Sequence, residues 1–295
     1  MFLSENQIHF QKNVCTKPAK TKIVDFDGDN LPDRAFFRSS DGRWRYRKSS
    51  DNSIVTLNWG LSGDITQPGD YDGDRKSDVA VYRPSDGTWY IVNSSNGSYT
   101  IIKFGTAEDK PVSADFNGDG VTDIAVYRPS DGNWYIYFIN LGQYAITHFG
   151  IAEDKPVPED FDGDGKTDLA VYRPSTGVWY YLKSSDGNFV ALRWGISTDT
   201  PAPADFDGDS KADINVFRAS ESKWYVLKSS DNQFFTYIYG NAGDIPQVSD
   251  WDGNGTFDLG IYRPDTKLWY STINDNPTTF GETGEIPASS ILKTE

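Results

Sequence analysis

A nine-residue acidic pattern recurs six times in this chain, at a constant interval of 45 residues. It reads D-x-D-G-D-x-x-x-D with minor variation, and it begins at Asp25, Asp70, Asp115, Asp160, Asp205 and Asp250. A fixed period of this length is typical of repeat architectures, in which each repeat buries its apolar face only by stacking on its neighbours. The spacing therefore predicts six equivalent structural units.

The residue types in the pattern point to a bound cation. In the fourth copy, positions 1, 3, 5 and 9 are Asp160, Asp162, Asp164 and Asp168. Four carboxylates this close repel one another unless a cation neutralises them. Oxygen ligands without His or Cys favour a hard cation, and Ca²⁺ accepts six to eight of them, whereas Mg²⁺ keeps its waters. By analogy with other calcium loops, the carbonyl of position 7 and a bidentate position 9 complete the set, while Gly163 lets the chain bend around the ion.

The sequence thus predicts up to six Ca²⁺ ions, one for each loop. The predicted ligands are Asp25, Asp27, Asp29, Leu31 and Asp33; Asp70, Asp72, Asp74, Lys76 and Asp78; Asp115, Asn117, Asp119, Val121 and Asp123; Asp160, Asp162, Asp164, Lys166 and Asp168; Asp205, Asp207, Asp209, Lys211 and Asp213; and Asp250, Asp252, Asn254, Thr256 and Asp258. Asn117 and Asn254 carry less charge, so their loops should bind more weakly. The alternative is a set of Asp/Gly-rich turns without metal. The loop does not match an EF-hand, which is longer and lies between helices.

The residues around each loop predict four short strands per unit. In the unit from 106 to 150 these strands cover 110–114, 124–128, 133–138 and 144–149, separated by Pro/Ser/Asp/Gly and Asn/Leu/Gly turns. Four strands in about 45 residues are typical of a β-propeller blade. We therefore expect an all-β fold, a six-bladed β-propeller, with a seven-bladed ring whose last blade is degenerate as the alternative. Residues 20–295 form this single domain. Residues 1–19 are an N-terminal extension with a probable blade-closing strand, and 282–295 resemble the start of another unit.

Three further residue types recur with the same period. They are the tryptophans Trp44, Trp89, Trp134, Trp179, Trp224 and Trp269; the arginines Arg38, Arg83, Arg128, Arg173, Arg218 and Arg263; and the aspartates Asp64, Asp109, Asp154, Asp199 and Asp244. We interpret the tryptophans as packing between blades, with sugar stacking as the alternative. The arginines are interpreted as structural, stacking or bonding to a neighbouring blade, with an anion site near the axis as the alternative. The aspartates are expected to cap turns.

The acidic loops account for the net charge of −15. They hold 22 of the 43 acidic residues, and the remaining 21 are outnumbered by 28 Lys and Arg. Six bound Ca²⁺ ions would change the net charge from −15 to −3. No basic patch indicates nucleic-acid binding. One Cys excludes an intrachain disulfide, and no apolar stretch is long enough to insert into a membrane. The first residues, 1–5, are not a signal peptide. We expect a module of a longer exported protein.

The stretch 160–174, followed by Gly177-Val178-Trp179-Tyr180, resembles a bacterial FG-GAP/VCBS-type repeat. The resemblance covers residues 20–281. Related repeats build the propeller of integrin α subunits, where the loop between the first two strands of a blade holds calcium. The resemblance implies an extracellular or cell-surface module for adhesion and ligand binding. The chain departs from the integrin pattern in having six units, Tyr-Arg-Pro in place of Gly-Ala-Pro, and a metal loop in almost every unit.

These observations favour a secreted or cell-surface binding, adhesion or scaffold module that is stabilised by calcium. Its partner would be an extracellular protein or glycan, and the module itself would be monomeric. A lectin that uses the repeated Trp and Tyr residues is the alternative. A polysaccharide hydrolase is less favoured, because only His9 and His148 are present and no asymmetric pair of carboxylates breaks the repeat. We therefore expect no enzymatic activity.

Overall fold

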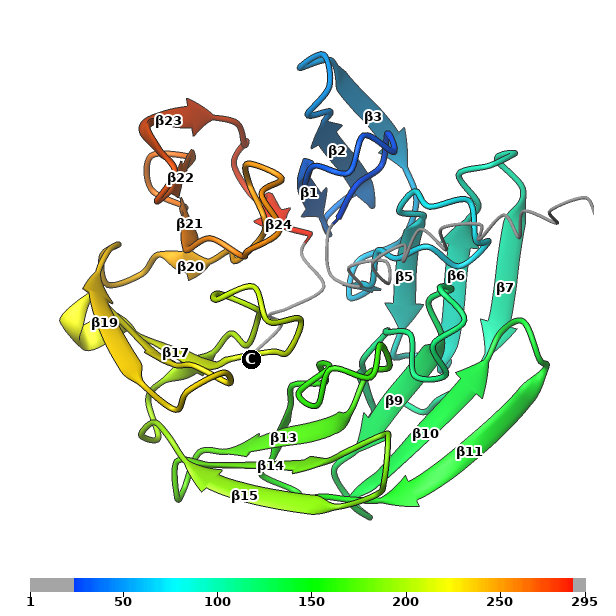
Figure 1. Cartoon of the computed structure of the whole chain (residues 1–295). Helices are drawn as coiled ribbons and strands as arrows, with labels where there is room; N and C mark the ends of the chain where they lie inside the picture. Colours follow the sequence, from blue (N-terminus) through cyan, green and yellow to red (C-terminus); the bar gives the residue numbers. More distant parts are fainter. Residues whose placement is uncertain (1–23, 289–295) are drawn as a thin grey trace, which may run out of the picture.

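The chain forms a ring of six four-stranded antiparallel sheets around a central axis (Figure 1). The structure, a computed structural model, describes residues 24–288, without the side chains of 274–276. The predicted six-bladed propeller is confirmed. The seven-bladed alternative is wrong, because the segment after the sixth unit joins the first sheet instead of starting another. Within 24–288 the only helical element is the 3₁₀ turn η1 (Ala219–Glu221), so no helix there could cross a membrane.

Each blade runs from a two-residue strand near the axis to a longer strand at the rim. Blade 1 contains β24 (Ile286–Pro287), β1 (Arg34–Arg38), β2 (Arg43–Arg47) and β3 (Ile54–Asn58); blade 2 contains β4 (Ile65–Thr66), β5 (Val79–Arg83), β6 (Thr88–Val92) and β7 (Tyr99–Lys103). Blade 3 contains β8 (Lys110–Pro111), β9 (Ile124–Arg128), β10 (Asn133–Phe138) and β11 (Gln143–His148); blade 4 contains β12 (Lys155–Pro156), β13 (Leu169–Arg173), β14 (Val178–Leu182) and β15 (Phe189–Arg193). Blade 5 contains β16 (Thr200–Pro201), β17 (Ile214–Arg218), β18 (Lys223–Leu227) and β19 (Phe234–Ile238); blade 6 contains β20 (Ile245–Pro246), β21 (Gly260–Arg263), β22 (Leu268–Ser271) and β23 (Asn274–Thr279).

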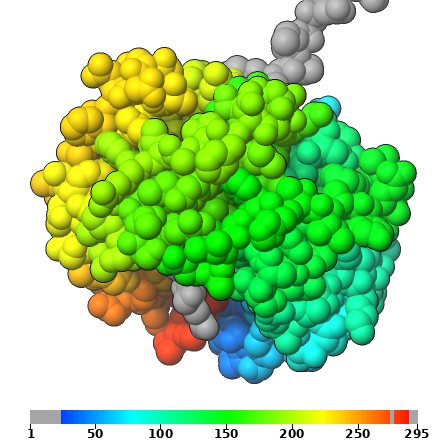
Figure 2. All heavy atoms as spheres, turned by 90° about the horizontal axis from the view of Figure 1, so that it is seen from below, coloured from blue at the N-terminus to red at the C-terminus, as the bar shows by residue number. Residues whose placement is uncertain are grey.

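The burial of the strands follows from their place in the blade. β5 reads Val-Ala-Val-Tyr-Arg and its first four residues are buried, since both of its faces pack against neighbouring blades. The outer strand β7 alternates exposed and half-buried residues, since one face meets the next blade and the other meets solvent. Seen from the side, neighbouring blades pack against each other along the rim (Figure 2).

The repeated tryptophans are core residues. Five of them are fully buried, and Trp269 is 4% exposed. The Trp134 Nε1–H donates to the Phe149 carbonyl at 2.8 Å, and its ring lies in one cluster with Leu169 and Val171 of the next blade. The other five make the same bond to the aromatic residue that closes their unit. The packing interpretation is confirmed, and the sugar-stacking alternative for these tryptophans is wrong.

The repeated arginines and aspartates form one structural unit in blades 2 to 6. The Arg128 guanidinium donates to both carboxylate oxygens of Asp109, at 2.7 and 2.9 Å, and lies 4.2 Å above the ring of Tyr135. Asp109 also accepts a bond from the Thr106 amide, which confirms the predicted turn cap. The arginine is structural as expected, but its partners belong to its own blade and not to a neighbouring one. Each of these five guanidiniums binds both carboxylate oxygens of its aspartate. The alternative of an anion site near the axis therefore has no support.

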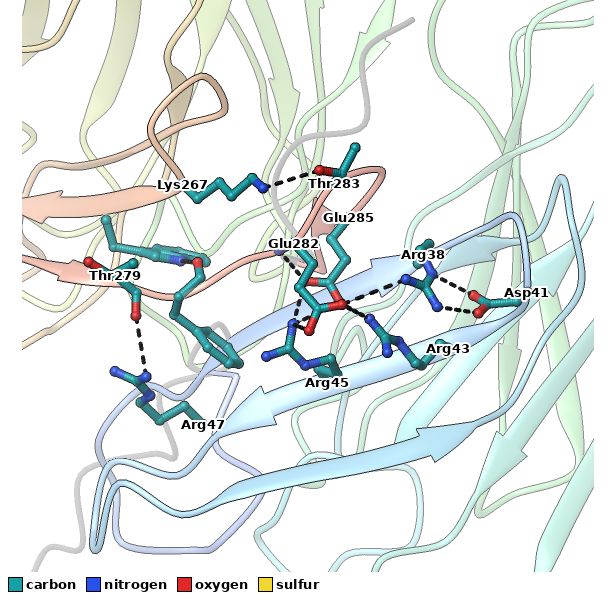
Figure 3. A network of polar contacts seen from close by, with 12 residues as sticks. Arg38, Asp41, Arg43, Arg45, Arg47, Lys267, Thr279, Glu282, Thr283 and Glu285 are labelled. Atoms are coloured by element: carbon teal, nitrogen blue, oxygen red, sulfur yellow. Dashed lines mark hydrogen bonds and ion pairs between the residues drawn. The ribbon is translucent and has the colours of Figure 1, made fainter.

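The ring closes through blade 1, where the repeat is altered. β24 pairs with β1, so Phe36 faces Pro287 and the last described residues supply the innermost strand of the first sheet. The side chain of Glu285, which precedes β24, is fully buried and accepts bonds from Arg43 at 3.0 Å and Arg45 at 2.9 Å (Figure 3). Arg45 stands where the other blades have the tyrosine that stacks on arginine. The strand predicted within residues 1–19 lies outside the described residues.

We expect Gly87→Ala to destabilise the propeller far more than Gly97→Ala. Both glycines have a positive φ, +67° and +70°, so any side chain costs about 1–2 kcal/mol in either place. A Cβ at Gly87 would also lie 2.2 Å from the Gly105 carbonyl oxygen, whereas nothing lies within 4 Å of a Cβ at Gly97. Urea unfolding of both variants measures the difference. Equal losses of unfolding free energy would contradict this packing.

Candidate metal centres

In blades 2 to 6 each acidic loop connects the first and second strands of its blade, and in blade 1 the loop 25–33 leads into the second strand, β1. The loop 70–78, for example, leaves β4 and enters β5, and the bridge between Gly69 and Asp78 closes its base. Every loop enters the second strand of its blade at the same end, so all six lie on one face of the ring, around the axis (Figure 1). The fold therefore places six equivalent sites side by side.

Carboxylates at positions 1 and 9 hold the loop in shape. In the fourth loop, Asp160 accepts bonds from the amides of Gly163 at 2.6 Å and Gly165 at 2.8 Å. Asp168 accepts a bond from the amide of Phe161 at 2.9 Å. These bonds curl the backbone so that the remaining carboxylate oxygens point toward a common centre.

The left-handed backbone expected in the loops is present at two positions. Position 6 has a positive φ in all six loops, including +68° at Arg75, the residue least suited to it. Position 4 is glycine in every loop, and the space that a Cβ would occupy is filled from the next loop. A Cβ at Gly163 would lie 3.0 Å from Cγ of Lys211, the position 7 residue of the fifth loop. The side chains of position 7 therefore pack on the preceding loop, and the ligand role of their carbonyls stays a prediction.

Three carboxylates converge in five of the six loops, with ligand oxygens that all lie within 4.8 Å of one another. The groups are Asp25, Asp27 and Asp29; Asp70, Asp72 and Asp78; Asp160, Asp162 and Asp168; Asp205, Asp207 and Asp213; and Asp250, Asp252 and Asp258. The third loop has no such group, because Asn117 replaces the acid at position 3. The predicted position 5 aspartate belongs to the converging group only in the first loop.

Pairs of serines that were not predicted complete four of the sites. Ser184 donates from its amide to Asp168 at 2.7 Å and from its hydroxyl to Asp164 at 2.9 Å. Ser185 donates from its hydroxyl to Asp162 at 2.6 Å. The equivalent pairs are Ser49 and Ser50, Ser94 and Ser95, and Ser229 and Ser230. The Ser-Ser dipeptide recurs with the 45-residue period, and this signal could have identified them.

Consecutive loops are joined by backbone hydrogen bonds. The amide at position 8 donates to the carbonyl of position 1 in the preceding loop, as from Thr167 to Asp115 at 2.9 Å. The other links run from Ser77 to Asp25, Thr122 to Asp70, Ala212 to Asp160 and Phe257 to Asp205. The corresponding link from the first loop to the sixth is impossible, because position 8 of the first loop is Pro32, which has no N–H.

Burial raises the pKa of the position 9 carboxyl groups. The pKa rises to about 7 in Asp33 and Asp123 and to about 6 in Asp78, Asp168 and Asp213. Desolvation is the largest cause, and neighbouring loop aspartates add to it. A carboxylate that is costly to ionise in an oxygen-lined site is the arrangement that a bound cation stabilises.

The donor set fits Ca²⁺. All side-chain donors are carboxylate or amide oxygens, and no His or Cys lies in the loops. In the fifth loop, Oδ1 of Asp207 is buried and has no hydrogen-bond partner among the described residues. A buried carboxylate oxygen without a partner is unusual, and a metal ion would satisfy it.

The calcium-free protein should lose stability as pH rises from about 5 to about 7. Unfolded aspartates titrate near 3.9, so over this range the folded state binds more protons than the unfolded state, and the unfolding free energy falls with pH. In calcium the same carboxylates are ionised on the metal, so the fall should shrink or reverse. Melting temperatures of calcium-stripped protein between pH 5 and 7.5, with a parallel series in calcium, measure this. A melting temperature that rises with pH without calcium would contradict it.

Comparison with known proteins agrees with this geometry. The model of a family described as FG-GAP-like repeat matches residues 70–126 and 160–216. No curated protein matches the chain in sequence. Among solved structures, the chain is similar to a lectin of Agrocybe aegerita that recognises non-reducing terminal N-acetylglucosamine, with 15% identity over 92% of this chain and 79% of that chain, and a TM-score of 0.58.

Two further structures share the fold. A streptogramin B lyase has 8% identity over 95% of this chain and 93% of that chain, with a TM-score of 0.60. A chain of a nidogen/laminin complex has 13% identity over 81% of this chain and 88% of that chain, with a TM-score of 0.53. Identities this low show the fold alone. This protein is a six-bladed β-propeller, and two of its stretches, 70–126 and 160–216, match the FG-GAP-like repeat.

Proposed function

We propose that this chain is a calcium-stabilised propeller that acts as an extracellular binding, adhesion or scaffold module. The observation that carries the proposal is the convergence of three carboxylates in five loops on one face of the ring. Backbone hydrogen bonds also join consecutive loops, so an ion bound in one loop would help to order the backbone of the next loop. Calcium would thereby stabilise contacts between blades as well as the loops themselves.

The magnitude of the effect supports a structural role for calcium. A site at ~100-fold saturation contributes about 2.7 kcal/mol to the free energy of unfolding. A domain is typically stable by only about 5–15 kcal/mol, so a few occupied sites decide whether the ring is folded. If these sites have the affinity of about 10⁻⁴–10⁻³ M that is usual in extracellular modules, they fill only where calcium is millimolar, which fits secretion or display on the cell surface.

We propose a non-catalytic role. The described residues form a nearly uniform ring, and a catalytic centre needs one asymmetric constellation. His148 is the single histidine in the described part of the chain, and it lies on the exposed strand β11 with Nδ1 3.1 Å from Oδ1 of Asn133.

A lectin remains the second candidate, now on different residues. Tyr99, Tyr144 and Phe189 occupy equivalent positions in three outer strands, and each is more than half exposed. Tyr99 stacks on Trp59 of the preceding blade at 4.8 Å, and Phe189 lies 6.1 Å from Phe149. Exposed aromatic faces repeated around a rim suit weak sugar binding with high avidity. Glycan screening in calcium distinguishes this candidate from a module that binds protein.

Removal of calcium should lower the melting temperature by more than about 20 °C. The estimate assumes at least four occupied sites at about 2.7 kcal/mol each and a shift of about 2–4 °C for each kcal/mol. Calorimetry in millimolar calcium and again in excess chelator measures it, with magnesium as the control ion. A melting temperature that chelator leaves unchanged would sink the proposal.

Calcium titration should reveal four tighter and two weaker sites. The third and sixth loops each contain an asparagine ligand and lack the serine pair. Asn117→Asp should convert one weak site to a tight one, whereas Asn58→Asp adds the same charge at the opposite end of blade 1 and should change nothing. Isothermal titration calorimetry counts the sites. Six identical sites in the unmodified protein would contradict this difference.

A further inference from the structure

The outer strand of blade 5 differs from the other outer strands in its exposure. All five residues of β19 are exposed, and four of them are large and apolar: Phe234 at 65%, Phe235 at 36%, Tyr237 at 48% and Ile238 at 76%. β3, β7 and β15 instead alternate exposed and half-buried residues. β19 therefore presents apolar side chains on both faces of the sheet.

The neighbouring blade explains this exposure. Tyr237 is equivalent to Ile102 of blade 2, and Ile102 packs against the same apolar cluster as Tyr137 of blade 3. At the position of Tyr137, blades 2, 4 and 5 have Val92, Leu182 and Leu227, whereas blade 6 has Thr272, and its last hairpin is four residues shorter. The apolar cover that protects the other outer strands is therefore missing beside β19, which lies at the rim of the ring (Figure 1).

β19 also lacks the features that usually prevent edge strands from pairing. Proteins protect such edges with charged residues or proline. Lys103, His148 and Arg193 stand at one position in β7, β11 and β15, and this position is Ile238 in β19. β23 contains Pro277. Residues 233–239 contain no charge, proline or glycine.

The backbone of β19 has donors and acceptors available at its open edge. The Tyr239 amide donates to the Ser222 carbonyl, and the Lys228 amide donates to the Gln233 carbonyl, both at 2.9 Å. With the β18–β19 register, this alternation directs the backbone groups of 233, 235, 237 and 239 toward β18. Those of 234, 236 and 238 point outward.

We propose that this edge pairs antiparallel with the β19 strand of a second copy of the chain, with Thr236 on the two-fold axis. In this register Phe234 faces Ile238 of the second copy on one face of the joined sheet, and Phe235 faces Tyr237 on the other. Aromatic and β-branched cross-strand pairs of this kind stabilise antiparallel sheets. Two chains that each carry a net charge of −15 repel each other electrostatically. The uncharged edge of β19 is a surface where they can associate without bringing like charges together. The contact uses no loop ligand and does not depend on the proposed role of calcium, and it differs from the monomeric state expected from the sequence.

Sedimentation velocity over a hundredfold range of concentration tests the proposal. The unmodified chain should approach twice its monomer mass of 33.0 kDa as concentration rises. Thr236→Lys places two ammonium groups opposite each other at the axis and should remain a monomer. Ile101→Lys makes the same exposed change at the equivalent position of β7, and it should still form dimers. A monomer at every concentration, or a dimer that survives Thr236→Lys, overturns the proposal.

A disulfide crosslink tests the register of the strand pairing. It also tests the dimer itself if the Thr236→Lys variant fails to fold. Residues opposite each other in an antiparallel pair have Cα atoms about 4.5–5.5 Å apart, within disulfide range. The double variant Cys15→Ser, Thr236→Cys should form a covalent dimer on mild oxidation. The matched variant Cys15→Ser, Ile101→Cys should crosslink at least tenfold more slowly. Equal rates would overturn the pairing.

Discussion

The architecture depends on the hydrogen bonds that join five of the six acidic loops to the one before. A position 8 amide donates to a position 1 carbonyl, and the residue that supplies this carbonyl also uses its carboxylate to shape its own loop. The same residues thus hold the metal site together and connect the blades. Packing of position 7 side chains over the glycines of the preceding loop reinforces the connection. A cation bound at any loop would therefore act on two blades at once.

The contact between blades 6 and 1 is where this uniformity ends. Pro32 removes one backbone link, and charged contacts take its place along the seam. Glu285 is buried between Arg43 and Arg45, Arg34 lies 4.9 Å from the ring of Trp251, and Arg45 and Arg47 lie over Phe280. The ring has no covalent closure, so its ends are held by two residues of β24 and by this network. Buried ion pairs are strongly sensitive to the loss of one partner, so this seam should depend on Glu285.

Variation among the repeats determines what each blade can do. The inner strands and buried tryptophans hardly change from blade to blade, because every blade packs between two similar blades. The outer strands are free to vary. Beside the shortened hairpin of blade 6, both faces of β19 are exposed, while the exposed aromatic residues of β7, β11 and β15 keep half-buried neighbours. The rim thus combines a repeated surface with one distinct edge.

The sequence alone determined the six repeats, the strands within each repeat, the acidic loops and their glycines, because a 45-residue period imposes one local structure on every copy. The choice between six and seven blades was decided by the pairing of β24 with β1. It also identified the tryptophan, arginine and aspartate positions, but not that Arg128 and Asp109 bind each other, since a pairing across 19 residues is visible only after the strands fold together. The serine pairs, the links between loops and the closing role of Glu285 likewise depend on which segments meet in space. The exposure of β19 is decided by blade 6, so only the tertiary structure could show it.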